Sequence, residues 1–281
     1  MGLLERRLRE DRRLIDAGLR RALRAESGVP RRLAQAMRYA LLGGGKRLRP
    51  ILALEAFRAC GGGELRRVMP FCCGLEMIHA FSLVHDDLPS MDDDDTRRGR
   101  PSLHRRFDEA TAILAADGLL ARGFGLMAEC AGPAERVRRV VGMVARAIGP
   151  AGMTGGQFAD VAEGRVGPAR LAVVQRQKTG ELIAVALAGG AVLAGAGRSV
   201  ERALVQAGYA IGALFQLTDD LLDEAQPADR NGNTMVACLG RARTLKRART
   251  MAGRAEAVLR GLGARFELLA ELPGSLLVRT E

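Results

Sequence analysis

The chain has 281 residues, of which 48% are hydrophobic, and it carries a formal net charge of +11. This composition excludes a disordered chain and supplies enough apolar side chains for a sizeable core. The charge alone admits nucleic acid, an acidic membrane surface or small polyanionic substrates as partners. Aromatic residues make up only 4% of the chain and Trp is absent, which disfavours a surface that stacks nucleic-acid bases.

The N-terminal sequence, MGLLERRLREDRRL, is charged throughout and lacks the apolar core of a secretory signal. The five cysteines include no C-x-x-C pair, so they favour reduced thiols over a zinc site or a disulfide framework. Both features predict a cytoplasmic protein. The longest apolar run, Leu182 to Gly197, is about two residues too short for a spanning helix, so it predicts a buried helix and no integral membrane segment.

Apolar residues recur at helical spacing along nearly the whole chain, and no alternating strand pattern stands out. Clusters of glycine and proline divide the sequence into roughly ten helical segments. These clusters lie at Ser27–Pro30, Gly43–Gly45, Gly61–Gly63, Gly132–Pro133, Gly149–Gly152, Gly164–Pro168, Gly195–Gly197 and Pro227–Gly232. The segments Leu182–Leu193 and Ala203–Leu222 are mostly apolar on all sides, which is typical of the interior of a large bundle. The sequence therefore predicts an all-α fold, a single large helical bundle, with one domain over residues 1–281.

A glycine-rich basic motif, GGGKRLRP, runs from Gly43 to Pro50. It lacks the G-x-x-x-x-G-K-[ST] spacing of a phosphate loop, because Arg47 follows Lys46, and no strand precedes it. Lysine is rare in this chain and occurs only at Lys46, Lys178 and Lys246. The motif predicts a basic clamp in which Lys46 and Arg49 meet a diphosphate near the end of a helix.

The first acidic cluster lies in the run HDDLPSMDDDDTRRGRPSLH, from His85 to His104. Its six aspartates are Asp86, Asp87, Asp92, Asp93, Asp94 and Asp95. Arginines follow at once, at positions 97, 98 and 100, and arginine is suited to bidentate contacts with diphosphate oxygens. The run predicts a site that binds a metal and a diphosphate together.

The second acidic cluster is QLTDDLLDE, with Asp219, Asp220 and Asp223 on an otherwise apolar helix. The first and last of these are four residues apart and project from one face. An acidic cluster is also typical of a solvated face, but unpaired charge on an apolar helix would be costly. A divalent cation relieves the repulsion among such carboxylates, and hard oxygen ligands suit Mg²⁺.

Together the motifs GGGKRLRP, IHAFSLVHDDLPSMDDDDTRRGRPSLH, QKTG and FQLTDDLLD resemble those of the trans-isoprenyl diphosphate synthases, and among them the bacterial farnesyl diphosphate synthases. Their order and spacing cover nearly the whole chain. The resemblance implies the isoprenoid synthase type of fold, with a central cavity, the two aspartate motifs facing each other across it, and a homodimer.

The resemblance also implies Mg²⁺ as the cofactor and assigns roles to individual residues. The main metal ligands would be Asp86, Asp92 and Asp219, supported by Asp87, Asp220 and Asp223. Isopentenyl diphosphate would be held by Lys46, Arg49, His79 and Arg98. The allylic substrate, dimethylallyl or geranyl diphosphate, would be held by Arg97, Lys178, Thr179 and Gln216. The catalytic residues would be Asp86, Asp92, Asp219, Lys178 and Arg97. Gln157 and Asp160 match a family segment that lines the same site.

The chain departs from the family pattern after the second aspartate motif. Family members carry a longer loop with a lysine and then G-K-x-T-Y, whereas this chain has EAQPADRNGNTMVACLG. Arg230 or Arg241 could replace the missing lysine. Otherwise the loop is an impaired lid.

Product length is assigned to the helix that precedes the first aspartate motif. Phe81 lies about 7.5 Å before Asp86 at a rise of about 1.5 Å per residue, and one isoprene unit adds a similar length. On an ideal helix Ser82 lies nearer the face of Asp86, so geometry leaves both residues open. The resemblance favours Phe81 and a farnesyl product, because an aromatic here and the longer first motif are typical of farnesyl-producing members. The alternative is that Phe81 is ordinary core packing.

Other functions stay open at this point. The chain could make geranylgeranyl diphosphate or another C10 or C20 product, or be a weakly active or non-catalytic subunit of a heteromeric synthase. A nucleic-acid binder would need a contiguous basic face. A class I terpene cyclase shares the first motif but lacks the clamp of Lys46 and Arg49.

Overall fold

The computed structural model describes residues 2–24, 28–223 and 233–278, except for the side chain of Asp223. The chain forms two compact units. Unit 1 comprises residues 1–54 and 64–141, and unit 2 comprises residues 55–63 and 142–281.

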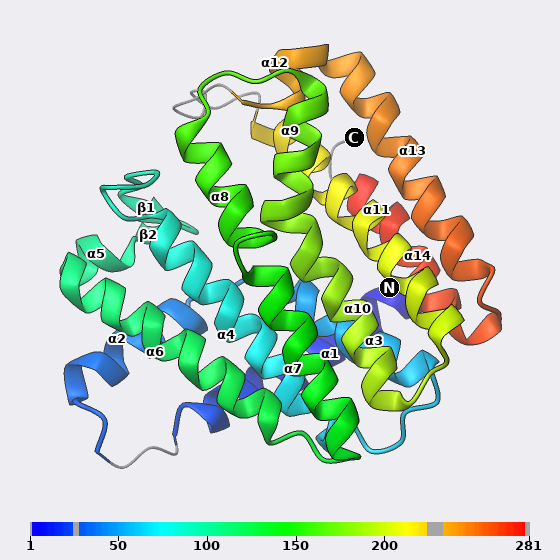
Figure 1. Cartoon of the computed structure of the whole chain (residues 1–281), viewed down its shortest axis with the longest axis horizontal. Helices are drawn as coiled ribbons and strands as arrows, with labels where there is room; N and C mark the ends of the chain where they lie inside the picture. Colours follow the sequence, from blue (N-terminus) through cyan, green and yellow to red (C-terminus); the bar gives the residue numbers. More distant parts are fainter. Residues whose placement is uncertain (1, 25–27, 224–232, 279–281) are drawn as a thin grey trace. The chain divides into compact units, whose positions relative to one another are not determined.

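Unit 1 is built from helices and one small hairpin (Figure 1). Its elements are α1 (Leu3–Ala22), α2 (Arg31–Leu42), the first part of α3 (Leu48–Ala59), η1 (Leu65–Arg67), α4 (Met69–Asp86), β1 (Thr96–Arg97), β2 (Arg100–Pro101), α5 (Leu103–Arg106), α6 (Glu109–Ala128) and the first part of α7 (Ala134–Ile148).

Helices α4 and α6 form the core of unit 1. Along α4, an unbroken run from Phe71 to Ile78 is buried, so this helix is covered on several sides. The two helices approach closely at Gly74, where an added Cβ would lie 2.6 Å from the carbonyl oxygen of Gly123. Asp108 fixes the start of α6, because its carboxylate accepts a hydrogen bond from the backbone amide of Thr111 at 2.6 Å. Helices α1 and α2 pack against this pair and complete the unit.

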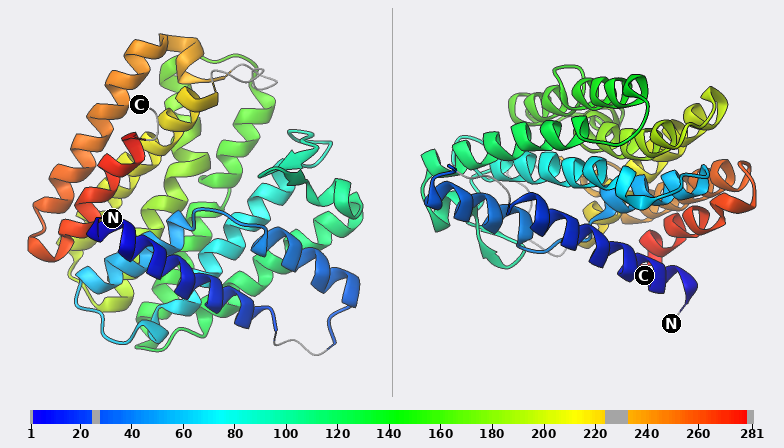
Figure 2. Two further views of the ribbon diagram at one scale, coloured as in Figure 1. Left: turned by 180° about the vertical axis from the view of Figure 1, so that it is seen from behind. Right: turned by 90° about the horizontal axis from the view of Figure 1, so that it is seen from below.

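Unit 2 contains the second acidic cluster. Its elements are the remainders of α3 and α7, then α8 (Met153–Ala162), α9 (Pro168–Gln175), η2 (Arg176–Gly180), α10 (Glu181–Ala194), α11 (Arg198–Asp223), α12 (Met235–Leu239), α13 (Arg241–Arg260), η3 (Ala264–Phe266) and α14 (Glu267–Leu277). Every residue from Leu182 to Leu193 is buried, which confirms the prediction of an interior helix there. Helices α11, α13 and α14 pack on one another, and α13 and α14 lie side by side in both views of Figure 2.

The all-α prediction is confirmed, with two local departures in the described part of the chain. A short antiparallel hairpin joins β1 and β2, and a π-helical turn, η2, interrupts the helix that runs from α9 into α10. The single-domain assignment stays a prediction. One described helix, α6, is long and apolar enough to cross a membrane by length and composition alone. Because α6 packs against α4, this is weak evidence for a span, and a core helix passes the same test.

Candidate active site

The first acidic run folds back onto the end of α4. The backbone amide of Asp92 donates to the carbonyl oxygen of Asp86 at 2.8 Å, and the amide of Asp94 donates to that of Asp87 at 3.2 Å. Asp93 adopts a left-handed conformation, with φ of 52°, which lets the chain reverse. The loop therefore brings the backbones of Asp86 and Asp92 side by side, and these are the two residues predicted as the main metal ligands of this motif.

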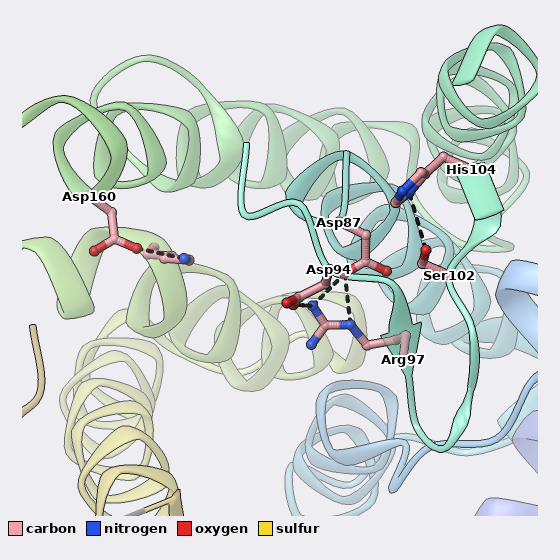
Figure 3. A network of polar contacts seen from close by, with 7 residues as sticks. Asp87, Asp94, Arg97, Ser102, His104 and Asp160 are labelled. Atoms are coloured by element: carbon pink, nitrogen blue, oxygen red, sulfur yellow. Dashed lines mark hydrogen bonds and ion pairs between the residues drawn. The ribbon is translucent and has the colours of Figure 1, made fainter. Parts of the chain in front are cut away.

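Arg97 pairs with the aspartates of this loop (Figure 3). Its Nε donates to Oδ1 of Asp87 at 2.8 Å, and its Nη2 donates to Oδ2 of Asp94 at 3.0 Å. Asp87 is buried, and this burial raises the pKa of its carboxyl group, although the hydrogen bond and the charge of Arg97 oppose the shift. The predicted ligand Asp87 and the predicted phosphate contact Arg97 thus neutralise each other in this structure.

The hairpin that carries the arginines was absent from the sequence prediction. Thr96 pairs with Pro101 and Arg97 with Arg100, and the turn between them consists of Arg98 and Gly99. These two residues have φ of 55° and 71°, which is the pattern of a type I′ turn. The strands are too short to show an alternating pattern, so the Arg-Gly dipeptide was the available signal. The turn positions Arg98 at the tip of the hairpin.

The hairpin contacts both the glycine-rich loop and α2. The Nη1 of Arg98 donates to the carbonyl oxygen of Gly44. This approach needs a residue without a side chain at Gly45, where an added Cβ would lie 2.6 Å from Nη1 of Arg98. Tyr39 on α2 donates from its hydroxyl to the carbonyl oxygen of Pro101 at 2.8 Å. The guanidinium of Arg100 stacks over the ring of Tyr39, with Cζ 4.1 Å from the ring centroid.

A cationic pocket of about 50 Å³ lies within unit 1, between α2, the glycine-rich loop, α4 and the hairpin. Its lining includes Arg47, Glu76, His79, Asp87, Arg97 and Arg98. Burial lowers the pKa of His79 well below the usual range for histidine, and the neighbouring arginines lower it further. His79 is therefore neutral at pH 7 and can serve this pocket as a neutral hydrogen-bonding group. The predicted isopentenyl contacts His79 and Arg98 are brought together here.

Phe81 and Ser82, the candidate determinants of product length, have different surroundings. The ring of Phe81 packs on that of His85 at a centroid distance of 4.6 Å. Nε2 of His85 in turn lies 3.8 Å from Oδ1 of Asp117 on α6. The hydroxyl of Ser82 donates to the carbonyl oxygen of His79 at 3.0 Å, within its own helix. Both roles in chain length stay predictions.

In unit 2, the predicted allylic contacts lie on and beside the π-helical turn. Turns of this kind occur mostly as short interruptions of α-helices, frequently at functional sites. Lys178 and Thr179 belong to η2, and Nζ of Lys178 donates to Oδ2 of Asp160 on α8 at 2.7 Å. Oγ1 of Thr179 lies 3.3 Å from Oε1 of Gln216 on α11. The structure therefore brings Lys178 to Asp160 and Thr179 to Gln216. That Lys178, Thr179 and Gln216 hold the allylic diphosphate stays a prediction.

Asp220 is the centre of a second polar network in unit 2. Its Oδ1 accepts from Nε2 of Gln216 at 3.0 Å. Its Oδ2 accepts from Nε2 of Gln175 at 3.2 Å and from the backbone amide of Met235 at 2.8 Å. Asp220 is buried, whereas Asp219 is partly exposed. This difference fits a supporting role for Asp220 and a direct role for Asp219. The side chain of Asp223 lies outside the described residues.

The donor chemistry of the aspartates fits Mg²⁺. Among the described residues, no three His, Cys, Asp or Glu side chains converge closely enough to hold a metal by themselves. Mg²⁺ usually binds one or two carboxylates and completes its shell with substrate phosphates and water, so such a cage is not required. Asp86, Asp92 and Asp219 supply carboxylate oxygens and are all partly exposed. Asp86 and Asp92 in unit 1, and Asp219 in unit 2, therefore each have the donor chemistry to ligate such an ion beside a diphosphate.

Three further residues were predicted near the site: Gln157, Arg230 and Arg241. Both side-chain amide atoms of Gln157 are buried without a hydrogen-bond partner, which suits a residue that contacts a ligand. Arg230 lies outside the described residues. Arg241 donates to the carbonyl oxygen of Leu221 at 3.1 Å, near the end of α11. Sequence reasoning missed Tyr39, and it missed the contacts of Arg47, for which adjacency to the clamp was the available signal.

Comparisons with known proteins agree with this geometry. Residues 30–237 match the sequence model of the polyprenyl synthetase family. The chain is 40% identical over 232 residues to the dimethylallyltranstransferase of Fischerella ambigua (strain UTEX 1903), an alignment that covers 81% of this chain and 66% of that protein. It is 41% identical over 226 residues to the farnesyl diphosphate synthase of Geobacillus stearothermophilus, with 78% and 75% covered. The chain thus spans just under two thirds of the first relative and three quarters of the second.

The fold matches as well. The crystal structure of a geranyltransferase from Legionella pneumophila superposes with a TM-score of 0.90 at 31% identity, covering 99% of this chain and 97% of that one. The predicted isoprenoid synthase type of fold is confirmed by this match. The chain belongs to the polyprenyl synthetase family.

Proposed function

We propose that this protein is a Mg²⁺-dependent head-to-tail prenyltransferase that joins isopentenyl diphosphate to dimethylallyl or geranyl diphosphate and yields farnesyl diphosphate. Membership of the polyprenyl synthetase family supports the prenyltransferase activity that the resemblance predicted. One observation carries the proposal furthest. The loop that places Asp86 beside Asp92 belongs to the same unit as the cationic pocket lined by His79, Arg97 and Arg98.

The reaction begins with ionisation of the allylic substrate. Magnesium bound by Asp86, Asp92 and Asp219 would neutralise charge on the departing diphosphate. Arg97 and Lys178 stabilise the same developing charge, so the allylic C–O bond breaks and leaves a carbocation. The double bond of isopentenyl diphosphate, held by Lys46, Arg49, His79 and Arg98, attacks this cation and forms the new C–C bond.

A proton then leaves the condensed cation and regenerates a double bond. We assign this proton to the released diphosphate, which is the nearest strong base in the proposed arrangement. Water has to be kept from the cation, because it would trap it as an alcohol. The apolar side chains of α4 serve this purpose in unit 1.

The farnesyl product rests on Phe81 and on the relatives. The Geobacillus relative is named a farnesyl diphosphate synthase. Other relatives carry the name geranylgeranyl pyrophosphate synthase, for example one from Catharanthus roseus at 42% identity over 73% of this chain. A C20 product is therefore the alternative that an assay has to separate from C15.

Assembly and location complete the proposal. We propose a cytoplasmic homodimer whose partners are small diphosphates and do not include nucleic acid. The support is the resemblance and the scarcity of base-stacking aromatic residues, which make up only 4% of the sequence and include no Trp. Light scattering on the purified chain tests the dimer, and retention on DNA at moderate salt tests the exclusion of nucleic acid.

The direct test of function incubates the purified chain with isopentenyl diphosphate, each allylic diphosphate in turn, and Mg²⁺. Farnesyl diphosphate should accumulate from both dimethylallyl and geranyl diphosphate. A product of twenty carbons would correct the chain length alone. No product from any allylic substrate would favour the non-catalytic subunit of a heteromeric synthase.

A further inference from the structure

Arg47 follows Lys46 in the glycine-rich loop, but its side chain is only 3% exposed. Nε donates to Oδ1 of Asp16 on α1 at 2.9 Å, and Nη1 donates to Oε1 of Glu76 on α4 at 2.7 Å. Nη2 donates to the carbonyl oxygen of Leu41 in the last turn of α2 at 3.0 Å. One guanidinium therefore ties together three helices of unit 1.

The backbone of Arg47 has an unusual conformation that these contacts hold in place. Its φ is 55°, in the left-handed region that residues with a side chain rarely adopt. Its carbonyl oxygen accepts from the amide of Ile51 at 3.0 Å, so Arg47 occupies the N-cap position directly before α3, which begins at Leu48. Lys46 directly precedes this turn and Arg49 lies in the first turn of α3. The directions in which the side chains of Lys46 and Arg49 point therefore depend on the backbone conformation of Arg47.

The ion pairs also affect the charge of the pocket. Glu76 lines the pocket and its side chain is 3% exposed. An unpaired carboxylate in that position would repel a diphosphate, and Arg47 neutralises it at 2.7 Å. Asp16, by contrast, does not line the pocket and touches Arg47 from α1. An effect of Asp16 on ligand binding would therefore have to pass through Arg47.

We propose that Asp16, Arg47 and Glu76 form a positioning triad that fixes the glycine-rich loop and so presents Lys46 and Arg49 to isopentenyl diphosphate. This inference rests on the proposed function, because it takes the clamp to bind that substrate. The competing explanation is that the triad serves only to stabilise the fold. The two explanations differ in whether a change at Asp16 affects one substrate selectively.

The test replaces Asp16 with Asn in the full-length chain. Asp16→Asn keeps the shape of the side chain but removes the charge that orients Nε of Arg47. The KM for isopentenyl diphosphate should rise by about fivefold or more, because a small displacement of binding groups weakens their contacts strongly. The KM for geranyl diphosphate and kcat should stay within about twofold of wild type, since neither depends on the clamp. Arg47→Lys, which keeps the charge but loses the three-way contact, should raise the same KM further.

Glu129→Gln serves as the matched control. Glu129 pairs with Arg122 at 2.8 Å in the same unit and is not among the described residues that line the cationic pocket, so its loss should leave both KM values unchanged. If Asp16→Asn lowers the melting temperature while both KM values stay at wild type, the triad is purely structural and the inference is wrong. An equal rise in both KM values would also contradict it. Should Arg47→Lys fail to fold, Asp16→Asn alone decides.

A second readout separates this inference from the proposed function. Calorimetry measures the binding of inorganic diphosphate to wild type and to Asp16→Asn, without turnover. If wild type binds diphosphate but transfers no prenyl group, the proposed function fails. The ratio of the Kd values of wild type and Asp16→Asn still tests whether the triad positions the clamp. A Kd at least about fivefold weaker in the variant supports the triad. Equal Kd values, or no binding by wild type, overturn it.

Discussion

The acidic groups of the two units are held in place by different kinds of contact. In unit 1, Asp87 is paired with the guanidinium of Arg97, which also contacts Asp94. In unit 2, Asp220 accepts hydrogen bonds from two glutamine amides and one backbone amide, all of them neutral donors. A charge pair can exchange partners when an anionic ligand arrives, whereas hydrogen bonds from these neutral donors hold the Asp220 carboxylate in its place.

This difference indicates different roles for the two aspartate motifs. In the proposed reaction Arg97 turns from Asp87 and Asp94 to a diphosphate, and the released aspartates then become available to a cation. The network around Asp220 instead joins α9, α11 and α12 and fixes the helix that carries Asp219. We therefore expect substitutions in unit 1 to act mainly on ligand binding, and Asp220 to act mainly through the rigidity of its surroundings.

The largest effect is expected from removing a predicted metal ligand in either unit. Asp86→Ala or Asp219→Ala should lower kcat by at least ~10²-fold, the scale of losing one electrostatic contact in the transition state. Folding should survive, because removing one of several clustered like charges relieves repulsion. Steady-state kinetics at saturating Mg²⁺ and circular dichroism check the two statements. Near-wild-type turnover in both variants would remove the metal assignment.

The clamp of unit 1 should show selectivity between substrates. Arg49→Ala or His79→Ala should raise the KM for isopentenyl diphosphate far more than the KM for geranyl diphosphate. A charge-assisted contact of this kind is worth ~2–3 kcal/mol, or about 30-fold to 150-fold in affinity. Initial rates with one substrate varied at a time give both constants. A rise in the allylic KM alone would show that the two sites are assigned the wrong way round.

Phe81 tests whether unit 1 also limits the product. If its ring forms the floor of the cavity, wild type should stop at fifteen carbons and Phe81→Ala should make products of twenty or more. Chromatography of the dephosphorylated products measures the distribution, and Ser82→Ala is the neighbouring control. Loss of stability in Phe81→Ala with an unchanged product distribution would identify Phe81 as core packing against His85.

A substitution at Asp220 tests whether its polar network makes unit 2 rigid at this point. Asp220→Asn places an amide group among donors that need an acceptor, which should cost ~1–3 kcal/mol in the free energy of unfolding. Urea unfolding measures this cost. The matched variant Asp94→Asn, at an exposed side chain, should change the free energy of unfolding by less. Equal costs would contradict the distinction between the two regions.

The smallest expected effect is a pH dependence that comes from His79. Its pKa is lowered in the folded protein by burial and by the neighbouring arginines, so below about pH 6.5 the unfolded chain binds a proton that the folded chain does not. Stability should therefore fall as the pH is lowered from 7 to 5. His79→Gln should flatten this slope in urea unfolding at the two pH values. An unchanged slope would mean that His79 is protonated in the folded state.

The sequence predicted the helical fold and the acidic motifs because both depend on local patterns. Helical periodicity located the buried α10, and the predicted helix over Ala203–Leu222 lies within α11. Contacts between segments far apart in the sequence could not be predicted. The bond from Arg98 to Gly44 and the triad around Arg47 join residues from 29 to 54 positions apart. Such contacts arise when helices pack, and no short pattern in the sequence encodes them.

The most direct measurement of the central claim counts diphosphate released against isopentenyl diphosphate consumed by the purified wild-type chain. With geranyl diphosphate and Mg²⁺ present, the two amounts should be equal, since each condensation releases one diphosphate. A chelator should stop both, and added Mg²⁺ should restore both. Diphosphate release without isopentenyl diphosphate at an undiminished rate, or condensation that persists under the chelator, would contradict a Mg²⁺-dependent head-to-tail prenyltransferase.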